Sequence, residues 1–125
     1  MSAWTSDELD RIGRAEELEL TTVRSDGTPR KPVTIWVVRN NGDLFIRSWQ
    51  GQAATWFRSA QVRPQAHIQS GGIERDVELV GADQSLNEQI DAGYRAKYMP
   101  VAASYVDPMV SPQARATTLK LEPRS

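Results

Sequence analysis

Apolar and polar residues alternate along most of the chain, and this period of two is typical of strands with one buried face. Leu18, Leu20 and Thr22 share one face of the first such segment, and a later segment alternates apolar side chains with Glu74 and Asp76. The pattern predicts six strands, over residues 18–23, 33–38, 44–49, 65–70, 73–80 and 118–122.

Turn residues separate these segments and join most of them as hairpins. Asn41 and Gly42 form a compact hairpin signal, and Gly71 and Gly72 form a second one. Successive hairpins leave sheet edges that closure into a barrel removes. We therefore expect a mainly β, α+β chain: a small antiparallel barrel with short helices covering its ends.

Capping signals place the helices. Thr5 and Glu8 fit a capping box for a first helix, which Gly13 would end, and a short helix is expected over about 52–60. The later helices carry comparable signals. Ser85 and Glu88 fit a second capping box for a helix to about Tyr98 that Pro100 stops, and Ser111 and Pro112 suit the N-cap and first position of a last helical turn.

The segment over 33–38 is apolar on both faces, because Val33, Ile35 and Val37 alternate with Thr34, Trp36 and Val38. A strand of this kind must pack its second face against a helix, a ligand or another subunit. The sequence leaves these three options open.

Length and composition narrow the function classes. The 125 residues fit a single domain spanning 1–125. Fifteen basic and sixteen acidic residues leave no net field that would favour nucleic acid or an anionic membrane. There is no cysteine, and His67 is the only histidine, so neither a thiolate metal site nor a catalytic triad is expected. No segment resembles a secretory signal or a membrane span, which makes a cytoplasmic protein the expectation.

The strongest candidate for binding chemistry is an anion site after the third strand. Arg47, Ser48, Gln52 and the free N–H groups at the start of the helix near Ala53 would together hold a phosphate. The alternative is that Arg47 pairs with a carboxylate and that Ser48 caps the next helix. Arg24, Arg30 and Lys31 flank the Asp26 turn, where they would contact a ligand or be solvated.

Three tryptophans, Trp36, Trp49 and Trp56, would suit the walls of a site for a flat ring system. The alternative is packing in the core or at a dimer interface. His67, between Ala66 and Ile68, is expected to be a half-buried packing residue.

The chain resembles the flavin-binding split β-barrel superfamily, which includes pyridoxamine-phosphate-oxidase-like and deazaflavin-reductase-like proteins. The segments that carry the resemblance are ELDRIG, DGTPRKPVTIWVV, DLFIRS, the WFR triplet, RDVELV, DAGYRAKY and SPQARATTLKL. More narrowly, the chain is similar over nearly its full length to an uncharacterised bacterial family in that group. The resemblance implies a six-stranded antiparallel split β-barrel that forms a homodimer.

It also implies FMN or a deazaflavin at the dimer interface and an oxidoreductase that transfers hydride to a small organic substrate. Arg47 and Ser48 would hold the phosphate, Thr34 and Trp36 would flank the ring, and Gln52 would close the loop. The lysine that many members carry near Gln52 is missing, and Trp56 stands where asparagine is common. A non-catalytic barrel that carries or senses a small anionic, aromatic or haem-like ligand, and a purely structural dimeric interaction protein, are the alternatives.

Overall fold

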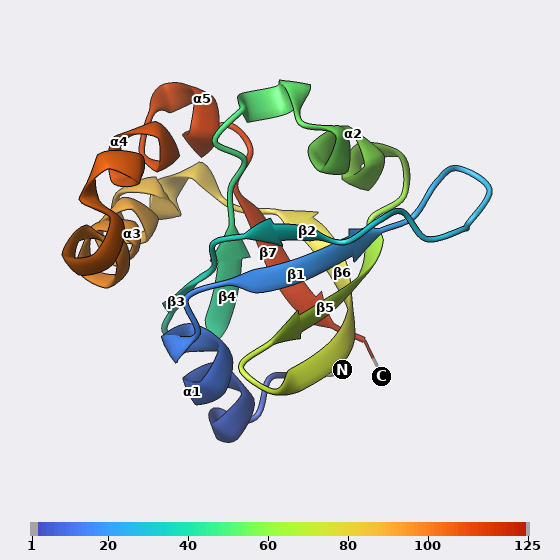
Figure 1. Ribbon diagram of the computed structural model, residues 1–125, viewed down its shortest axis with the longest axis horizontal. Helices are drawn as coiled ribbons and strands as arrows, with labels where there is room; N and C mark the ends of the chain where they lie inside the picture. The colour runs from blue at the N-terminus through green and yellow to red at the C-terminus, as the bar shows by residue number, and fades with distance from the viewer. Residues whose placement is uncertain (1–2, 125) are drawn as a thin grey trace.

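A curled, seven-stranded antiparallel sheet forms the body of the protein, whose computed structural model describes residues 3–124 (Figure 1). Its spatial order is β2-β1-β5-β6-β7-β4-β3. The strands are β1 (Leu18–Thr22), β2 (Val33–Ile35), β3 (Val38–Asn40), β4 (Asp43–Ile46), β5 (Gln65–Ser70), β6 (Ile73–Gly81) and β7 (Leu119–Pro123). The predicted α+β class and antiparallel sheet are confirmed, whereas the strand count is seven and not six.

The extra strand arises because the predicted strand over 33–38 is broken. Its two halves, β2 and β3, form opposite edges of the sheet and are joined only through Trp36 and Val37. At the break, Val37 N–H donates to Tyr98 Oη at 3.2 Å, and Val37 O accepts from Lys97 Nζ at 2.6 Å and from Tyr98 Oη at 3.1 Å. Because side chains satisfy these backbone groups, the chain can leave the sheet ladder without losing hydrogen bonds.

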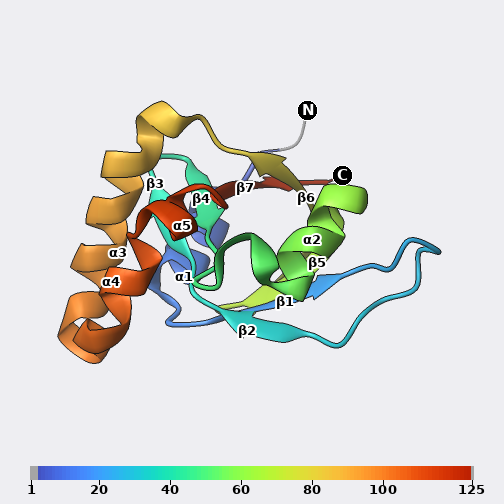
Figure 2. The same ribbon diagram turned by 90° about the horizontal axis from the view of Figure 1, so that it is seen from above.

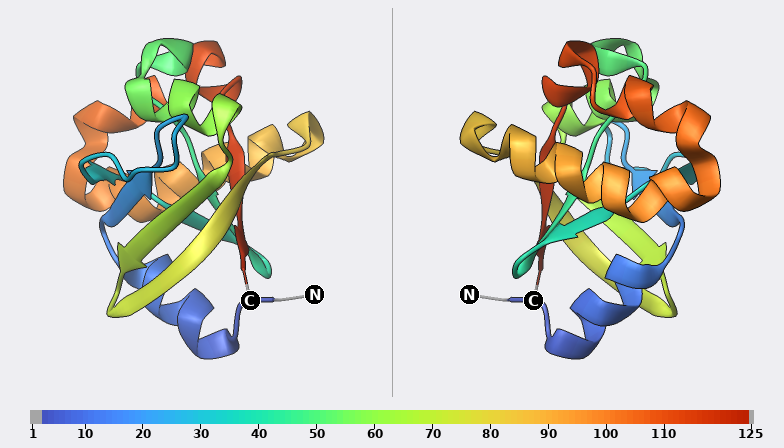
Figure 3. Two further views of the ribbon diagram at one scale, coloured as in Figure 1. Left: turned by 90° about the vertical axis from the view of Figure 1, so that its right-hand side faces the viewer. Right: turned by 90° about the vertical axis from the view of Figure 1, so that its left-hand side faces the viewer.

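Within residues 3–124, five helices and three 3₁₀ turns surround the sheet. The helices are α1 (Ser6–Arg14), α2 (Thr55–Val62), α3 (Asn87–Ala102), α4 (Val106–Met109) and α5 (Pro112–Arg115), and the turns are Gly51–Ala53, Gln84–Leu86 and Ala103–Tyr105. α1 lies at one end of the barrel and α2 at the other, at the bottom and top of Figure 1. α3 and α4 lie together along one side of the sheet (Figures 2 and 3). No helix within residues 3–124 is long and apolar enough to cross a bilayer.

Two apolar clusters hold these layers together. The first fills the barrel, with Leu18, Leu20 and Ile68 fully buried. The second lies between the outside of β3 and β4 and helices α3 and α4, and it includes Val38 and Tyr98. Helix α3 therefore packs against Trp36 and Val38 of the second face, which is one of the three options left open by the sequence, whereas Thr34 is exposed.

The caps of the helices agree with the sequence in part. The Thr5 capping box is confirmed, since Glu8 N–H donates to Thr5 Oγ1 at 3.1 Å and Thr5 N–H to Glu8 Oε1 at 2.9 Å. Ser111 caps α5, as predicted, by accepting from Ala114 N–H at 3.2 Å. Asn41 adopts a positive φ of 55° in the predicted hairpin turn between β3 and β4.

Three predicted helix boundaries are wrong. α1 runs past Gly13 to Arg14. The turn that leads into α3 is capped by the Asp83 carboxylate, which accepts from Ser85 N–H at 2.8 Å, and not by a box between Ser85 and Glu88. α3 continues through Pro100 to Ala102. Pro100 removes one helical hydrogen bond, the one to the carbonyl of Ala96, and Ala96 is exposed, so water can satisfy that carbonyl.

Candidate functional site

A groove of about 730 Å³ lies between β2, the end of β4, the start of α2 and α4. We call it the tryptophan groove. It brings together six of the seven site residues predicted from the sequence, Thr34, Trp36, Arg47, Ser48, Trp49 and Trp56, and adds Tyr105 and Met109. Pockets of this volume suit small-molecule ligands.

Gln52 is the predicted site residue that lies elsewhere. It is exposed in the 3₁₀ turn Gly51–Ala53 and does not line the groove. The turn depends on Gly51, whose φ is +65° and whose hypothetical Cβ would lie 2.3 Å from Gln113 Cγ. The glycine loop is therefore a sharp, closely packed corner between the groove and α5.

The three tryptophans have different environments. Trp36 is half-buried, and its ring stacks on that of Tyr98 with 3.8 Å between centroids and 1° between planes. Trp56 is 8% exposed and belongs to the barrel core, as the alternative of core packing predicted. Trp49 is 61% exposed and Tyr105 68%. The groove thus has two packed aromatic walls and two aromatic side chains with free surface.

Arg47 is fully buried at the inner side of the groove. Its Nη1 donates to Asp91 Oδ1 at 2.5 Å and to Met109 O at 3.0 Å, and its Nε donates to Thr118 Oγ1 at 2.9 Å. Arg115 pairs with the second oxygen of Asp91. Burial alone would raise the pKa of Asp91, but hydrogen bonds from Arg115 and Arg47 outweigh it and hold that pKa below its usual value.

This network accounts for the charge of Arg47. The alternative in which Arg47 pairs with a carboxylate is confirmed, and the guanidinium joins the end of β4 to α3 and α4. Its predicted role in holding a phosphate stays a prediction, because the nitrogens of Arg47 already donate to Asp91, Met109 and Thr118.

Ser48 presents a buried hydroxyl without a partner. β4 ends at Ile46, so strand alternation no longer separates Arg47 from Ser48, and both line the groove. Ser48 N–H donates to Thr117 Oγ1 at 2.9 Å, but Ser48 Oγ has no hydrogen-bond partner within residues 3–124. The alternative in which Ser48 caps the next helix is wrong, because the turn starts after Gln50 without a side-chain cap. A buried, unpartnered hydroxyl beside a groove is a hydrogen-bonding group that an ordered water or a bound ligand could satisfy.

His67 lies on the outer face of β5, away from the groove. Its Nδ1 lies 2.8 Å from Asp76 Oδ1 and its Nε2 lies 2.9 Å from Glu74 Oε1. The hydrogen bond with Asp76 and that with Glu74 outweigh partial burial and raise the pKa of His67. His67 is half-buried, as expected, but its ring contacts two carboxylates in place of packing against apolar side chains. Within residues 3–124, no three His, Asp or Glu side chains are placed to hold a metal ion.

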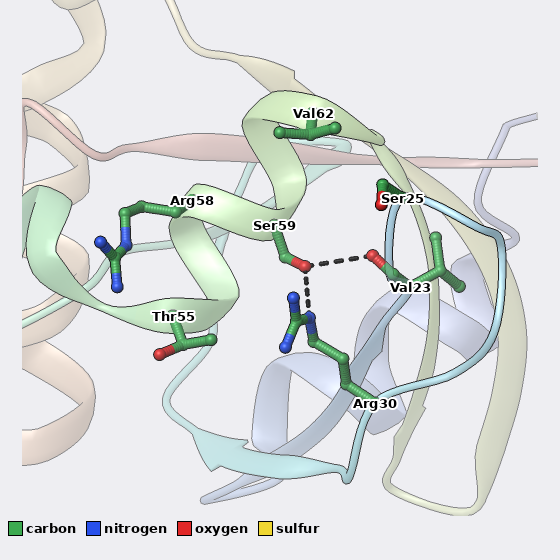
Figure 4. A pocket seen from close by; sticks show the side chains of 7 residues that line it. All are labelled: Val23, Ser25, Arg30, Thr55, Arg58, Ser59 and Val62. Atoms are coloured by element: carbon green, nitrogen blue, oxygen red, sulfur yellow. Dashed lines mark hydrogen bonds between the residues drawn. The ribbon is translucent and has the colours of Figure 1, made fainter.

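A second, smaller pocket of about 370 Å³ lies between α2 and the loop that joins β1 to β2 (Figure 4). Arg30 from the loop and Thr55, Arg58 and Ser59 from α2 line it. Sequence reasoning considered Arg30 but missed Arg58 and Ser59. Their spacing from Thr55, at i+3 and i+4 on a helix, was the signal that could have placed all three on one face.

The chain matches one known protein family in sequence. A family model described as an uncharacterized protein conserved in bacteria (DUF2255) matches residues 8–121. No curated protein is detectably similar to the chain in sequence.

Solved structures share its architecture. The haem storage protein HutZ from Vibrio cholerae matches with a TM-score of 0.67 at 18% identity over 99% of this chain and 92% of that one. A putative pyridoxamine 5'-phosphate oxidase from Listeria innocua gives 0.65 at 16% identity over 94% and 90%. An F420 reductase gives 0.56 at 14% identity over 94% and 93%. Identities this low show the fold alone, and they confirm the predicted split-barrel fold.

Proposed function

The chain belongs to the bacterial family DUF2255, and we propose that this member binds the ring system of a flavin or deazaflavin in its tryptophan groove. One observation carries the proposal: the buried Ser48 hydroxyl, unpartnered within residues 3–124, lies in a groove with aromatic walls. A flavin ring carries carbonyl and nitrogen acceptors along one edge, and Ser48 Oγ would donate to one of them. The F420 reductase and the oxidase-like neighbour make this ligand class a natural candidate on the shared fold.

The aromatic residues supply the apolar part of the site. Trp49 and Tyr105 expose 61% and 68% of their surface, and a flat ring lying against them would remove part of that surface from water. Each 100 Å² of apolar area buried in this way contributes about 2.5 kcal/mol before the costs of binding. The Trp36 ring stacks on Tyr98, so this wall is already formed before a ligand arrives.

The same surface supports a homodimer. Trp49 and Tyr105 line the groove, and Met99 and Val101, which shortly precede Tyr105 in the chain, are 49% and 63% exposed. β2 has a hydrogen-bonded neighbour on one side only, β1. A second copy placed over this region would cover the apolar side chains and form the outer wall of the groove.

The residues that line the groove include no carboxylate and no histidine, and its one arginine is ion-paired. A bound flavin or deazaflavin would itself supply hydride transfer. The chain's residues would bind the ring, orient it and exclude water. We therefore propose an oxidoreductase that passes hydride to a small organic substrate.

Riboflavin, FMN and a deazaflavin titrated into the purified protein test the proposal through quenching of tryptophan fluorescence. We expect saturable quenching by riboflavin and a large loss of affinity in Trp49→Ala. Arg95→Gln changes an exposed side chain that lines neither the groove nor the smaller pocket, and it serves as the control. If none of the three compounds binds saturably, the proposal is wrong.

The absence of acid and base groups from the groove lining also favours a second candidate, a carrier that binds the ring without catalysis. In that case, reduced flavin bound to the protein would pass electrons to a quinone acceptor no faster than free reduced flavin. An oxidoreductase would accelerate the transfer.

A further inference from the structure

The pocket under α2 has the chemistry of an oxyanion site. Arg30 reaches from the loop before β2 toward the face of α2 that carries Thr55, Arg58 and Ser59 (Figure 4). Trp56, on the same helix, lines the tryptophan groove instead. Different faces of α2 thus line two distinct concavities.

A hydrogen-bond relay fixes Arg30 and leaves its outer nitrogens available. Arg30 Nε donates to Ser59 Oγ at 2.6 Å, and Ser59 Oγ in turn donates to Val23 O at 3.1 Å. Neither Arg30 nor Arg58 forms an ion pair with a carboxylate of residues 3–124, in contrast to Arg47. The two terminal nitrogens of Arg30 and the whole guanidinium of Arg58 therefore have donors to offer.

The surroundings of the pocket are strongly basic for a chain with a net charge of −1. The segments 21–35 and 51–64 contain five cations, Arg24, Arg30, Lys31, Arg58 and Arg63. Their one acidic residue is Asp26, whose carboxylate already accepts from Thr28 N–H and Thr28 Oγ1. The two segments that supply the pocket therefore carry more positive than negative charge, which favours anions.

We propose that this pocket binds a phosphate-class oxyanion, with Arg58 and the terminal nitrogens of Arg30 as charged donors and Thr55 Oγ1 as a neutral one. Guanidinium groups match the geometry of phosphate oxygens and form charge-assisted hydrogen bonds with them. The bond from Arg30 Nε to Ser59 holds the first guanidinium in position before the anion arrives. The phosphate could be free or could be the ester group of a ligand whose ring lies in the tryptophan groove.

Calorimetric titration with inorganic phosphate and pyrophosphate at low ionic strength tests the site. Arg58 is exposed and Arg58→Gln keeps a helix-forming side chain, so the variant is expected to fold, which circular dichroism will verify. Loss of one charged donor should weaken binding by roughly 10- to 100-fold. Arg95→Gln, an exposed arginine on α3, is the matched control and should bind like the wild type.

A parallel comparison of FMN with riboflavin identifies the source of the phosphate. If FMN binds more tightly and Arg58→Gln abolishes the difference, the site takes the ester group of the groove ligand. If the two bind equally while inorganic phosphate binding depends on Arg58, the site takes a free anion. Either result supports the pocket, even if riboflavin fails to bind and the groove proposal falls. The proposal is overturned if Arg58→Gln changes neither phosphate binding nor the FMN-to-riboflavin ratio.

Discussion

Replacing Asp91 by asparagine is expected to be among the most destabilising single changes in the protein. The side chains of Arg47 and Asp91 are 0% and 1% exposed, so the substitution leaves the Arg47 charge buried without its counter-ion. Removing one partner of a buried pair costs about 3–5 kcal/mol. Arg115 loses its carboxylate partner as well, but it is 38% exposed and can be rehydrated.

Urea unfolding measures this cost directly. With an m-value of about 2 kcal/mol/M, a loss of about 4 kcal/mol lowers the urea midpoint by about 2 M. Asp10→Asn is the matched control, because Asp10 pairs with Arg39 at 2.8 Å where both side chains are exposed. An exposed pair contributes about 0–1 kcal/mol. The reasoning is refuted if the two variants lose similar amounts of stability.

The same comparison has a pH dependence of known sign. The pKa of Asp91 is lowered in the folded protein, so its contribution is present above the unfolded-state pKa and is lost as the pH falls through the lower folded-state pKa. The stability gap between the wild type and Asp91→Asn should therefore narrow below about pH 3.9. Replacing both partners, as Arg47→Met with Asp91→Leu, should recover much of the loss, because no buried charge is left unpaired.

Three further predictions concern other parts of the fold. Tyr98→Phe removes the acceptor of Val37 N–H and should lower the free energy of unfolding in urea by about 1–3 kcal/mol. Hydrogen exchange at the Val37 amide should become faster, and unchanged exchange would contradict the role of the hydroxyl. Gly51→Ala should lower the melting temperature well beyond Gly42→Ala, because Gly51, unlike Gly42, combines a positive φ with a side chain that crowds the added Cβ. His67→Gln should lower stability more at pH 5.5 than at pH 9, since the raised pKa of His67 stabilises the fold below the unfolded pKa and that contribution fades as the pH rises through the folded one. A pH-independent difference in melting temperature would contradict the last of these.

Local sequence signals predicted the elements that depend on local chemistry. The strand Gln65–Ser70, the positive φ of Asn41 and the Ser111 cap all follow from residues within a few positions of one another. The break at Val37 does not, because the side chains that satisfy it, Lys97 and Tyr98, lie 60 and 61 residues away. Nothing in an apolar run of six residues distinguishes one strand from two.

The candidate site shows the same division. The strand-end location of Arg47 and Ser48 was predicted from the sequence, since it depends on where β4 gives way to the glycine corner. The ion pair between Arg47 and Asp91 could not be predicted, because Asp91 lies 44 residues away on α3. The sequence left carboxylate pairing open as an alternative, and only the packing of α3 against β4 decides it.

The covalent link between β2 and β3 has a mechanical consequence. In a barrel whose neighbouring strands are all hydrogen-bonded, backbone hydrogen bonds fix the circumference. Here the edge strands β2 and β3 are joined at Val37, whose backbone is held by the side chains of Lys97 and Tyr98. The Tyr98 ring also stacks on Trp36, which lines the groove. The stacked rings of Trp36 and Tyr98 therefore affect both the shape of the groove and the position of the Val37 backbone. A ligand that moves Trp36 would also change the spacing between the two edges of the sheet.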